Sequence, residues 1–152
     1  MPYQLKRLPD LPALIVTLDQ RLDVTELRTM FRESHNLTRP EDEHIYRVLD
    51  FRNAHMPLPE LLLLIHAAMQ SFMPGAMLDP RIEDIPVGSA HWVHVARDWF
   101  SRHLYKGRHV PLFATPEAAV RYIQQREAGR NPVPTDGDNG GSEEAQSGFQ
   151  GQ

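Results

Sequence analysis

Short apolar segments alternate with helix-forming segments along most of this 152-residue chain, and this alternation limits the folds that it can adopt. The run Ala13 to Leu18, Ala-Leu-Ile-Val-Thr-Leu, is almost continuously apolar, which is typical of a strand covered on both faces. Tyr3 to Leu8 is a second strand-like segment, and the turn residues Leu-Pro-Asp-Leu-Pro between the two favour a hairpin. A hairpin followed by strands that alternate with helices predicts an α/β fold.

Three helices are predicted from their end signals and apolar patterns. Asp23-Val-Thr-Glu26 resembles a capping box, and the helix that it opens should end near Asn36. A second helix, apolar on most sides, is expected from about Pro59 to Phe72. The third has a suitable N-cap residue in Thr115, with Pro116 at its first position and Gly129 as its C-terminal stop.

Three further strands are expected after the hairpin, at Ile45 to Phe51, His91 to Ala96 and Val110 to Ala114, with a short helix from Trp99 to Lys106. Right-handed crossovers through the helices would make these strands parallel. The sheet should therefore be mixed and largely parallel, with helices packed on it. The segment Met73 to Ala90 is rich in Pro and Gly, and is expected to form either a short helix around Ala76 to Asp84 or a flap.

The order of these elements resembles the STAS-like domains of the anti-sigma-factor-antagonist superfamily, over roughly residues 3 to 128. The segments that carry the resemblance are Ile-Tyr-Arg-Val-Leu-Asp-Phe-Arg-Asn-Ala from Ile45 and Val-Pro-Leu-Phe-Ala-Thr-Pro-Glu-Ala-Ala-Val-Arg-Tyr-Ile from Val110. The resemblance implies a β-α sheet with helices packed on it and a role in protein regulation. Phosphorylated members of that family carry Ser or Thr at the start of the helix after the third strand. The matching stretch, Phe51 to Glu60, contains neither, so we expect no phosphate switch there.

Composition divides the chain into one folded domain, residues 1 to 128, and a tail, residues 129 to 152. The tail is rich in Gly, Ser and Gln, and it carries four acidic residues and one arginine. Such a segment buries too little apolar surface to fold, so we expect it to be disordered. Because it holds most of the net charge of −4, the domain itself is close to neutral.

Charge and cysteine content exclude several classes of function. A net charge of −4 argues against nucleic-acid binding, which needs clustered positive charge. The absence of cysteine rules out disulfides, thiol catalysis and thiolate metal sites, and it suits a cytoplasmic protein. The N-terminus has no apolar signal region, and the apolar run Leu58 to Met69 is too short to cross a bilayer, so no membrane association is expected.

A first candidate site consists of polar residues at the ends of the predicted strands, where the carboxyl ends of parallel strands meet at one edge. This strand-end rim contains Asp19, Asp50, Arg52, Asn53, His55, Arg97, Asp98 and Thr115. It could hold a small polar ligand or contact a partner, with Asp50 as the strongest single candidate. The simpler explanation, which we favour, is that strand ends are solvated and their turns are polar in any case.

A second candidate site is the predicted helix that begins near Pro59, which has more apolar positions than one sheet-facing stripe requires. The residues of this interaction helix and its continuation are Leu61, Leu62, Ile65, Met69, Met73 and Met77. They favour a homodimer or a groove for another protein. Alternatively, the segment Met73 to Ala90 folds back and covers them.

No metal or cofactor site is predicted. His91 and His94 stand three residues apart on a predicted strand, where side chains alternate, so they should point to opposite faces and could not share an ion. Arg97, Arg102 and their basic neighbours, Lys106 and Arg108, could form a patch for phosphate or an acidic partner, although a solvated helix face is the simpler explanation.

The sequence therefore predicts a non-catalytic regulatory or protein-interaction domain that lacks the phosphorylatable Ser or Thr, with another protein or a second copy as its partner. A second hypothesis is a small-ligand carrier or sensor, which would bind between the strand-end rim and the segment Met73 to Ala90. An enzyme that works through Asp50 and His55 is a third.

Overall fold

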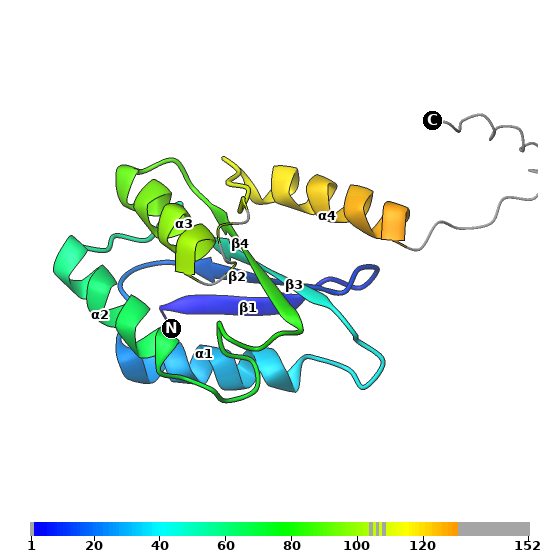
Figure 1. Cartoon of the computed structure of the whole chain (residues 1–152), viewed down its shortest axis with the longest axis horizontal. Helices are drawn as coiled ribbons and strands as arrows, with labels where there is room; N and C mark the ends of the chain where they lie inside the picture. The colour runs from blue at the N-terminus through cyan, green and yellow to red at the C-terminus, as the bar shows by residue number, and fades with distance from the viewer. Residues whose placement is uncertain (1, 104, 106, 108, 131–152) are drawn as a thin grey trace, which may run out of the picture.

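A computed structural model describes residues 2–103, 105, 107 and 109–130 of the chain. Within these residues one sheet contains four strands in chain order: β1 (Tyr3–Arg7), β2 (Ala13–Leu18), β3 (Ile45–Asp50) and β4 (Ile82–Val87). Strand β1 is antiparallel to β2, and β2, β3 and β4 are parallel to one another. The predicted α/β fold, with an N-terminal hairpin and a mixed, largely parallel sheet, is confirmed (Figure 1).

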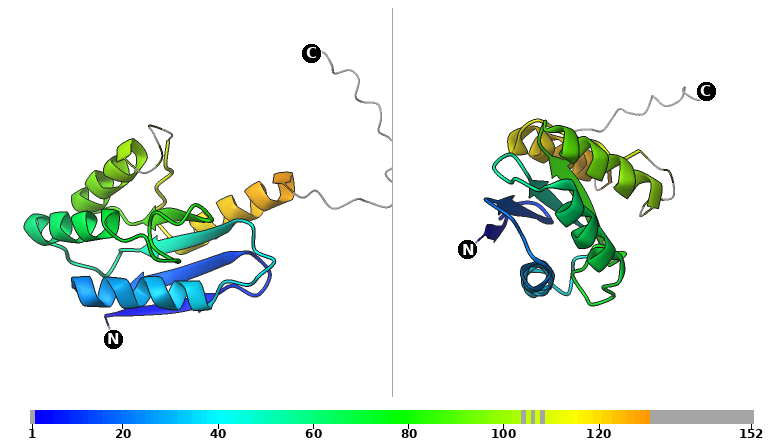
Figure 2. Two further views of the ribbon diagram at one scale, coloured as in Figure 1. Left: turned by 60° about the horizontal axis from the view of Figure 1, so that its bottom comes forward. Right: turned by 90° about the vertical axis from the view of Figure 1, so that its left-hand side faces the viewer.

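The same residues form four helices: α1 (Val24–Asn36), α2 (Leu58–Met69), α3 (His91–His103) and α4 (Pro116–Arg130). Figures 1 and 2 show α1 and α4 on opposite sides of the sheet. Helices α1 and α2 share one apolar core with Phe100 of α3, whereas α4 packs into a separate core on the other face. None of the helices in this described part is long and apolar enough to cross a membrane.

The predicted N-terminal caps are found at α1 and α4, whereas the predicted stop of the last helix at Gly129 was wrong. The Asp23 carboxylate accepts a hydrogen bond from the Glu26 N–H, and the Glu26 carboxylate accepts one from the Asp23 N–H, each at 2.8 Å, which completes the capping box. The Thr115 hydroxyl accepts a hydrogen bond from the Ala118 N–H at 3.2 Å. Helix α4 continues through Gly129 to Arg130, and the rest of the predicted tail, from residue 131 onward, lies outside the described residues.

The fourth strand was predicted at the wrong place. It lies at Ile82–Val87, within the segment for which a short helix or a flap was expected. This strand carries Glu83, Asp84 and Pro86, residues that are rare in strands, and the cations that neutralise its acids come from distant parts of the chain. The missing N–H of Pro86 is tolerated because β4 stands at one end of the sheet.

The predicted strand from His91 to Ala96 is the first half of α3, which also includes most of the predicted helix from Trp99. The buried residues of α3 are Val93, Ala96 and Phe100, whose spacing of three and four is helical. The β-branched and aromatic residues suggested a strand because a six-residue window is too short to reveal that period.

The predicted fifth strand, Val110 to Ala114, is reduced to one parallel bridge between Phe113 and Val87. The Gly88 N–H donates to the Phe113 carbonyl at 2.9 Å. Pro111 has no N–H to donate, which limits further pairing here. This extended segment still leads directly into α4.

Candidate functional site

An apolar cavity of about 70 Å³ lies next to α2, and every residue that lines it is apolar. Its walls come from the C-terminal ends of β2 and β3, from α1, α2 and α3, from the turns that follow β2 and β3, and from the segment between α2 and β4. Four residues of α2 contribute, namely Leu61, Leu64, Ile65 and Ala68. An apolar lining of this kind offers a bound water no hydrogen-bond partner and can contact apolar molecules.

The cavity follows from how α2 is packed. Helix α2 makes closer backbone contact with α1 than with any strand, so side chains alone fill the space between α2 and the sheet. Three of these side chains are the flexible methionines Met30, Met56 and Met77. Unbranched thioether chains adapt to gaps of irregular shape, so the cavity can change its shape at low cost.

The strand-end rim is partly assembled around Asp50, at the end of β3. The buried Asp50 carboxylate accepts hydrogen bonds from the Arg52 backbone N–H at 3.1 Å, and from Nε and Nη2 of the Arg52 guanidinium at 3.0 Å each. Asp19, Asn53 and His55 are exposed. Because Asp50 is already paired with Arg52 within one turn, its carboxylate stabilises that turn.

Two residues of the predicted rim lie elsewhere. Arg97 and Asp98 are in α3, so the expectation that they end a strand was wrong. Arg97 donates to the Asp98 carboxylate at 2.8 Å and to the Val110 carbonyl at 3.3 Å, which fastens α3 to the extended segment before α4. Thr115 caps α4 close to the bridge that extends β4.

The turn after β3 was predicted to supply polar residues to a site, but it contributes apolar residues to the cavity wall. Phe51 and Met56, at its two ends, both line the cavity, whereas Arg52, Asn53 and His55 between them are exposed. Sequence reasoning missed Phe51 and Met56 because it looked for polar chemistry. No local signal in the sequence separates these two residues from ordinary core residues.

The predicted interaction helix is divided between the two sides of α2. Leu61, Ile65 and Met77 line the cavity, Met69 and Met73 are half-buried, and Leu62 is exposed. The exposed large apolar residues of this region, three of which the sequence analysis did not single out, are Leu58, Leu62, Leu63 and Phe72. The segment after α2 does not cover them, since Gly75 packs against the backbone of α1 at Phe31 and His35.

A buried ion pair lies on the same face of the sheet as the cavity. Arg47 of β3 and Asp84 of β4 stand opposite one another in the register, and Arg47 donates to both carboxylate oxygens, at 2.6 and 3.1 Å. Arg47 also donates to the Gly75 carbonyl, and the Tyr105 hydroxyl accepts a hydrogen bond from the Asp84 backbone N–H. Burial raises the pKa of Asp84, and the Arg47 guanidinium opposes that rise.

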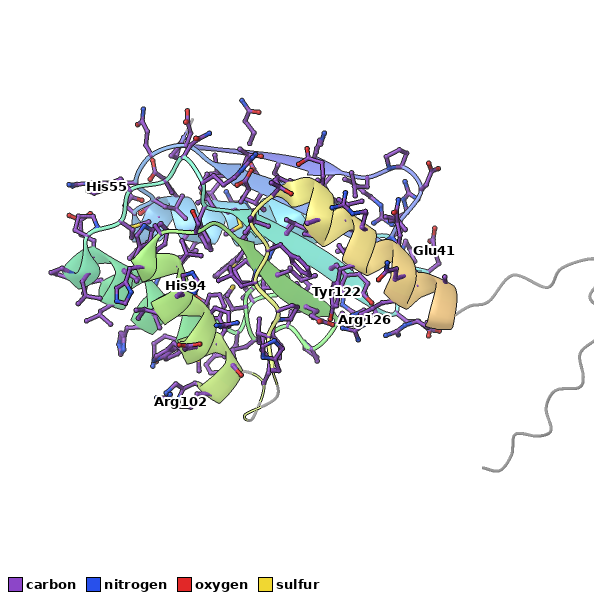
Figure 3. The ribbon with its side chains drawn as sticks, turned by 90° about the horizontal axis from the view of Figure 1, so that it is seen from above. Glu41, His55, His94, Arg102, Tyr122 and Arg126 are labelled. Atoms are coloured by element: carbon purple, nitrogen blue, oxygen red, sulfur yellow. The ribbon has the colours of Figure 1, made fainter. Side chains whose placement is uncertain are left out.

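A second ion pair lies on the opposite face of the sheet, which α4 covers and which we call the α4 face. It involves Glu83, the residue before Asp84 in β4. Glu83 accepts a hydrogen bond from Arg126 of α4 at 3.0 Å, and Arg126 also donates to the Tyr122 hydroxyl at 2.8 Å. The Arg126 guanidinium lies over the rings of Tyr46 and Tyr122, 5.7 and 5.5 Å from their centroids. Figure 3 shows Tyr122 and Arg126 projecting from α4. This cluster fastens α4 to the sheet.

The predicted separation of His91 and His94 was wrong, because both lie on α3, where residues three apart share one side of the helix. Both side chains are exposed, and Figure 3 shows His94 on α3. Within the described residues, no three His, Asp or Glu side chains are grouped so that they could hold a metal ion.

The fold and the cavity define an α/β domain with one apolar site beneath a helix. No family model matches the chain, and no curated protein does. Among solved structures, the chain is similar to a protein of the DUF3478 family from Shewanella loihica PV-4, described as having a SpoIIAA-like fold. That comparison covers 80% of this chain and 91% of that chain, with 12% identity and a TM-score of 0.47. The SpoIIAA-like fold is the same as the STAS-like fold that the sequence resembles.

Proposed function

We propose that this domain is a non-catalytic binding module that takes a small apolar ligand into the cavity beneath α2, and so acts as a carrier or sensor. The observation that supports this proposal is the cavity itself, whose lining is entirely apolar and includes three methionines. In an interior that is otherwise close-packed, an unfilled apolar space lacks dispersion contacts that a ligand can supply.

The chemistry of the lining also supports a role without catalysis. The cavity wall contains no acidic or basic side chain, and therefore no group that could transfer a proton to or from a bound molecule. The polar residues of the nearest turn are either exposed or, like Asp50, paired with a neighbour. Binding is the chemistry that such a wall can perform.

Methyl NMR of the intact chain, with methionine labelled at its methyl carbon, tests this proposal. Titration with a series of linear alcohols from butanol to decanol should shift the signals of Met30, Met56 and Met77. Met69 serves as an internal control because it is half-buried and does not line the cavity. Equal shifts at Met69, or no shift at any of the four, would contradict the proposal.

Three variants of α2 then locate the ligand. Ala68→Leu places a larger side chain in the cavity wall and should abolish the shifts, whereas Leu62→Ala, on the exposed side of α2, should leave them unchanged. Ile65→Ala enlarges the cavity and should favour longer alcohols over shorter ones. Binding that is unaffected by both Ala68→Leu and Ile65→Ala would place the ligand elsewhere.

A second candidate function is regulation through protein interaction, as the STAS-like resemblance implies. The observation that favours it is the exposure of Leu58, Leu62 and Leu63 on the outer side of α2, at 54%, 52% and 65%. Contiguous exposed apolar side chains favour an interface, and a second copy of this chain would cover such a patch symmetrically.

Native mass spectrometry at several protein concentrations tests the second candidate. A dimer of the 17.4 kDa chain is expected, and Leu62→Asp should dissociate it without loss of ligand binding. Gln70→Asp is the matched control, since it adds the same charge at an exposed position just after α2. A monomer at all concentrations argues against this candidate and leaves the ligand proposal unaffected.

A further inference from the structure

Most of the wall of the cavity is buried. Of the residues that line it, Phe51, Leu64 and Trp92 are half-buried, and all the others are buried. These three come from the turn after β3, from α2 and from the first turn of α3. The cavity therefore comes closest to solvent between α2 and the start of α3.

Two of these three half-buried residues are aromatic and contact one another. The rings of Phe51 and Trp92 meet edge to face, with centroids 5.1 Å apart and an interplanar angle of 65°. Such a pair contributes about 0.5 to 1.5 kcal/mol beyond the area that it buries. The rings can separate by rotation of the side chains, which is fast compared with movement of a helix.

The backbone beneath the rings is held in place. The Phe51 N–H donates to the Val87 carbonyl at 2.8 Å, which extends the pairing of β3 with β4. Gly88, whose φ is +154°, has no Cβ and so leaves room for the side chains of Val93 and Phe51. The Phe51 ring can therefore move while the strand end that carries it stays fixed.

Several exposed polar residues are neighbours of these two aromatic residues in the sequence. Arg52, Asn53 and His55 follow Phe51 in the same turn, and His91 directly precedes Trp92; all four are exposed. Inside the rings, a polar group would lack a hydrogen-bond partner, because every residue that lines the cavity is apolar. A molecule with one apolar and one polar end would satisfy both environments.

We propose that Phe51 and Trp92 form the entrance of the cavity, and that the ligand is a single-chain amphiphile whose hydrocarbon chain lies inside while its polar end stays at the two rings. This inference rests on the proposed function and names its ligand class and its route. The space of about 70 Å³ is smaller than the roughly 150 Å³ of an engineered cavity that binds benzene, so the methionines must move to admit a longer chain.

Tryptophan fluorescence tests the orientation of the ligand. The chain has two tryptophans, so Trp99→Phe leaves Trp92 as the only reporter. The probes are two isomers of bromooctanoate, with bromine next to the carboxylate or on the terminal carbon, because bromine quenches tryptophan at short range. At equal occupancy, fixed by the methionine shifts, the first isomer should quench Trp92 more strongly. Stronger quenching by the second isomer, or equal quenching, overturns the amphiphile orientation.

Stopped-flow fluorescence of the same protein tests the entrance. Phe51→Ala removes one ring and should raise the association and dissociation rates together, by about two- to tenfold, the range that corresponds to the energy of the ring pair. The dissociation constant should change less than either rate. Phe72→Ala is the matched control, because Phe72 is an aromatic residue that is 80% exposed and does not line the cavity.

The outcomes separate this inference from the proposed function. If octanoate binds but Phe51→Ala leaves both rates unchanged, the entrance lies elsewhere and the cavity proposal stands. If no alcohol or carboxylate shifts the methionine signals, both proposals fail. Leu64→Phe, which adds bulk at the third half-buried position without adding a tryptophan, should slow both rates and keeps the entrance testable if Phe51→Ala does not fold.

Discussion

The two faces of the sheet are packed in different ways. On the α4 face, one helix lies directly on β3 and β4, and Ala119 and Ile123 are fully buried against Tyr46 and Val48. On the opposite face, three helices share the cover, and α2 rests on α1 with the cavity beside it. A helix that packs directly on the sheet leaves little empty space. A helix that rests on another helix leaves more space between itself and the sheet. Ligand binding is therefore expected on the face that α1, α2 and α3 cover.

Charged groups show the same contrast. Asp84 and Glu83 are neighbours on β4 and point to opposite faces of the sheet, because side chains alternate along a strand. Asp84 pairs with an arginine that is fully buried, whereas the arginine that pairs with Glu83 has 37% of its side chain exposed. The ion pair without access to water, Arg47 with Asp84, therefore lies on the face of the sheet that contains the cavity.

The largest effect is expected at this buried pair. Asp84→Ala leaves Arg47 buried without its counter-ion, and the free energy of unfolding should fall by about 3 to 5 kcal/mol. Glu83→Ala, one residue away on the α4 face, should cost clearly less because Arg126 can turn to water. Urea denaturation of the two variants measures the difference. An equal loss would show that the two faces do not differ in this respect.

The second effect compares apolar side chains on the two faces. Ile123→Ala removes contacts from the closely packed α4 core and should cost about 3 to 5 kcal/mol, the upper part of the range for such changes. Ile65→Ala should cost at least about 1 kcal/mol less, because Ile65 already borders empty space and has fewer contacts to lose. The same denaturation experiment measures both values. A larger loss at Ile65 would mean that the cavity is filled in solution.

The sequence was a good guide where local signals decide the structure. The capping box at Asp23, the cap at Thr115 and the apolar run Ala13 to Leu18 each use neighbouring residues, and each was predicted correctly. Strand β4 was missed because its acids are stabilised by Arg47 and Arg126, which lie far away in the sequence. A window along the chain contains no information about such partners.

The candidate site was harder to predict than the fold, for a physical reason. Apolar residues at the positions of Phe51, Met56 and Trp92 are indistinguishable in sequence from ordinary core residues, and only the packing of α2 leaves a space between them. Asp50, in contrast, stood out as a polar residue at a strand end, but the structure pairs it with Arg52. Polar patterns reveal sites of polar chemistry, whereas an apolar site depends on tertiary packing.

A smaller effect is expected at acid pH, in the loop that covers Arg47. Burial alone would raise the pKa of Asp79, but hydrogen bonds from the N–H groups of Gly75 and Arg81 outweigh burial and lower it. A lowered pKa in the folded state adds stability above the unfolded-state pKa near 3.8, and this stability is lost as the pH falls through the folded-state pKa.

Asp79→Asn removes this contribution and should lower the free energy of unfolding at pH 7 by about 1 kcal/mol. The variant and the parent should then converge as the pH falls below the pKa of free aspartate. Urea denaturation between pH 7 and pH 3 measures the two curves. Parallel curves over that interval would show that Asp79 stabilises the loop equally when it is protonated.

The smallest effect is expected on the outer side of α2. The Leu63 side chain is 65% exposed, so Leu63→Ser removes little buried surface and should change the free energy of unfolding by no more than about 0.5 kcal/mol. Ile65→Ser, two positions along the same helix, should cost several times as much, because it puts a hydroxyl into the apolar wall of the cavity. If Leu63→Ser costs more than about 1 kcal/mol, and the loss grows with protein concentration, the outer side of α2 is covered by a second copy in solution. Helix α2 would then be buried on both of its sides, and the contrast between the two faces of the sheet would hold only for the monomer.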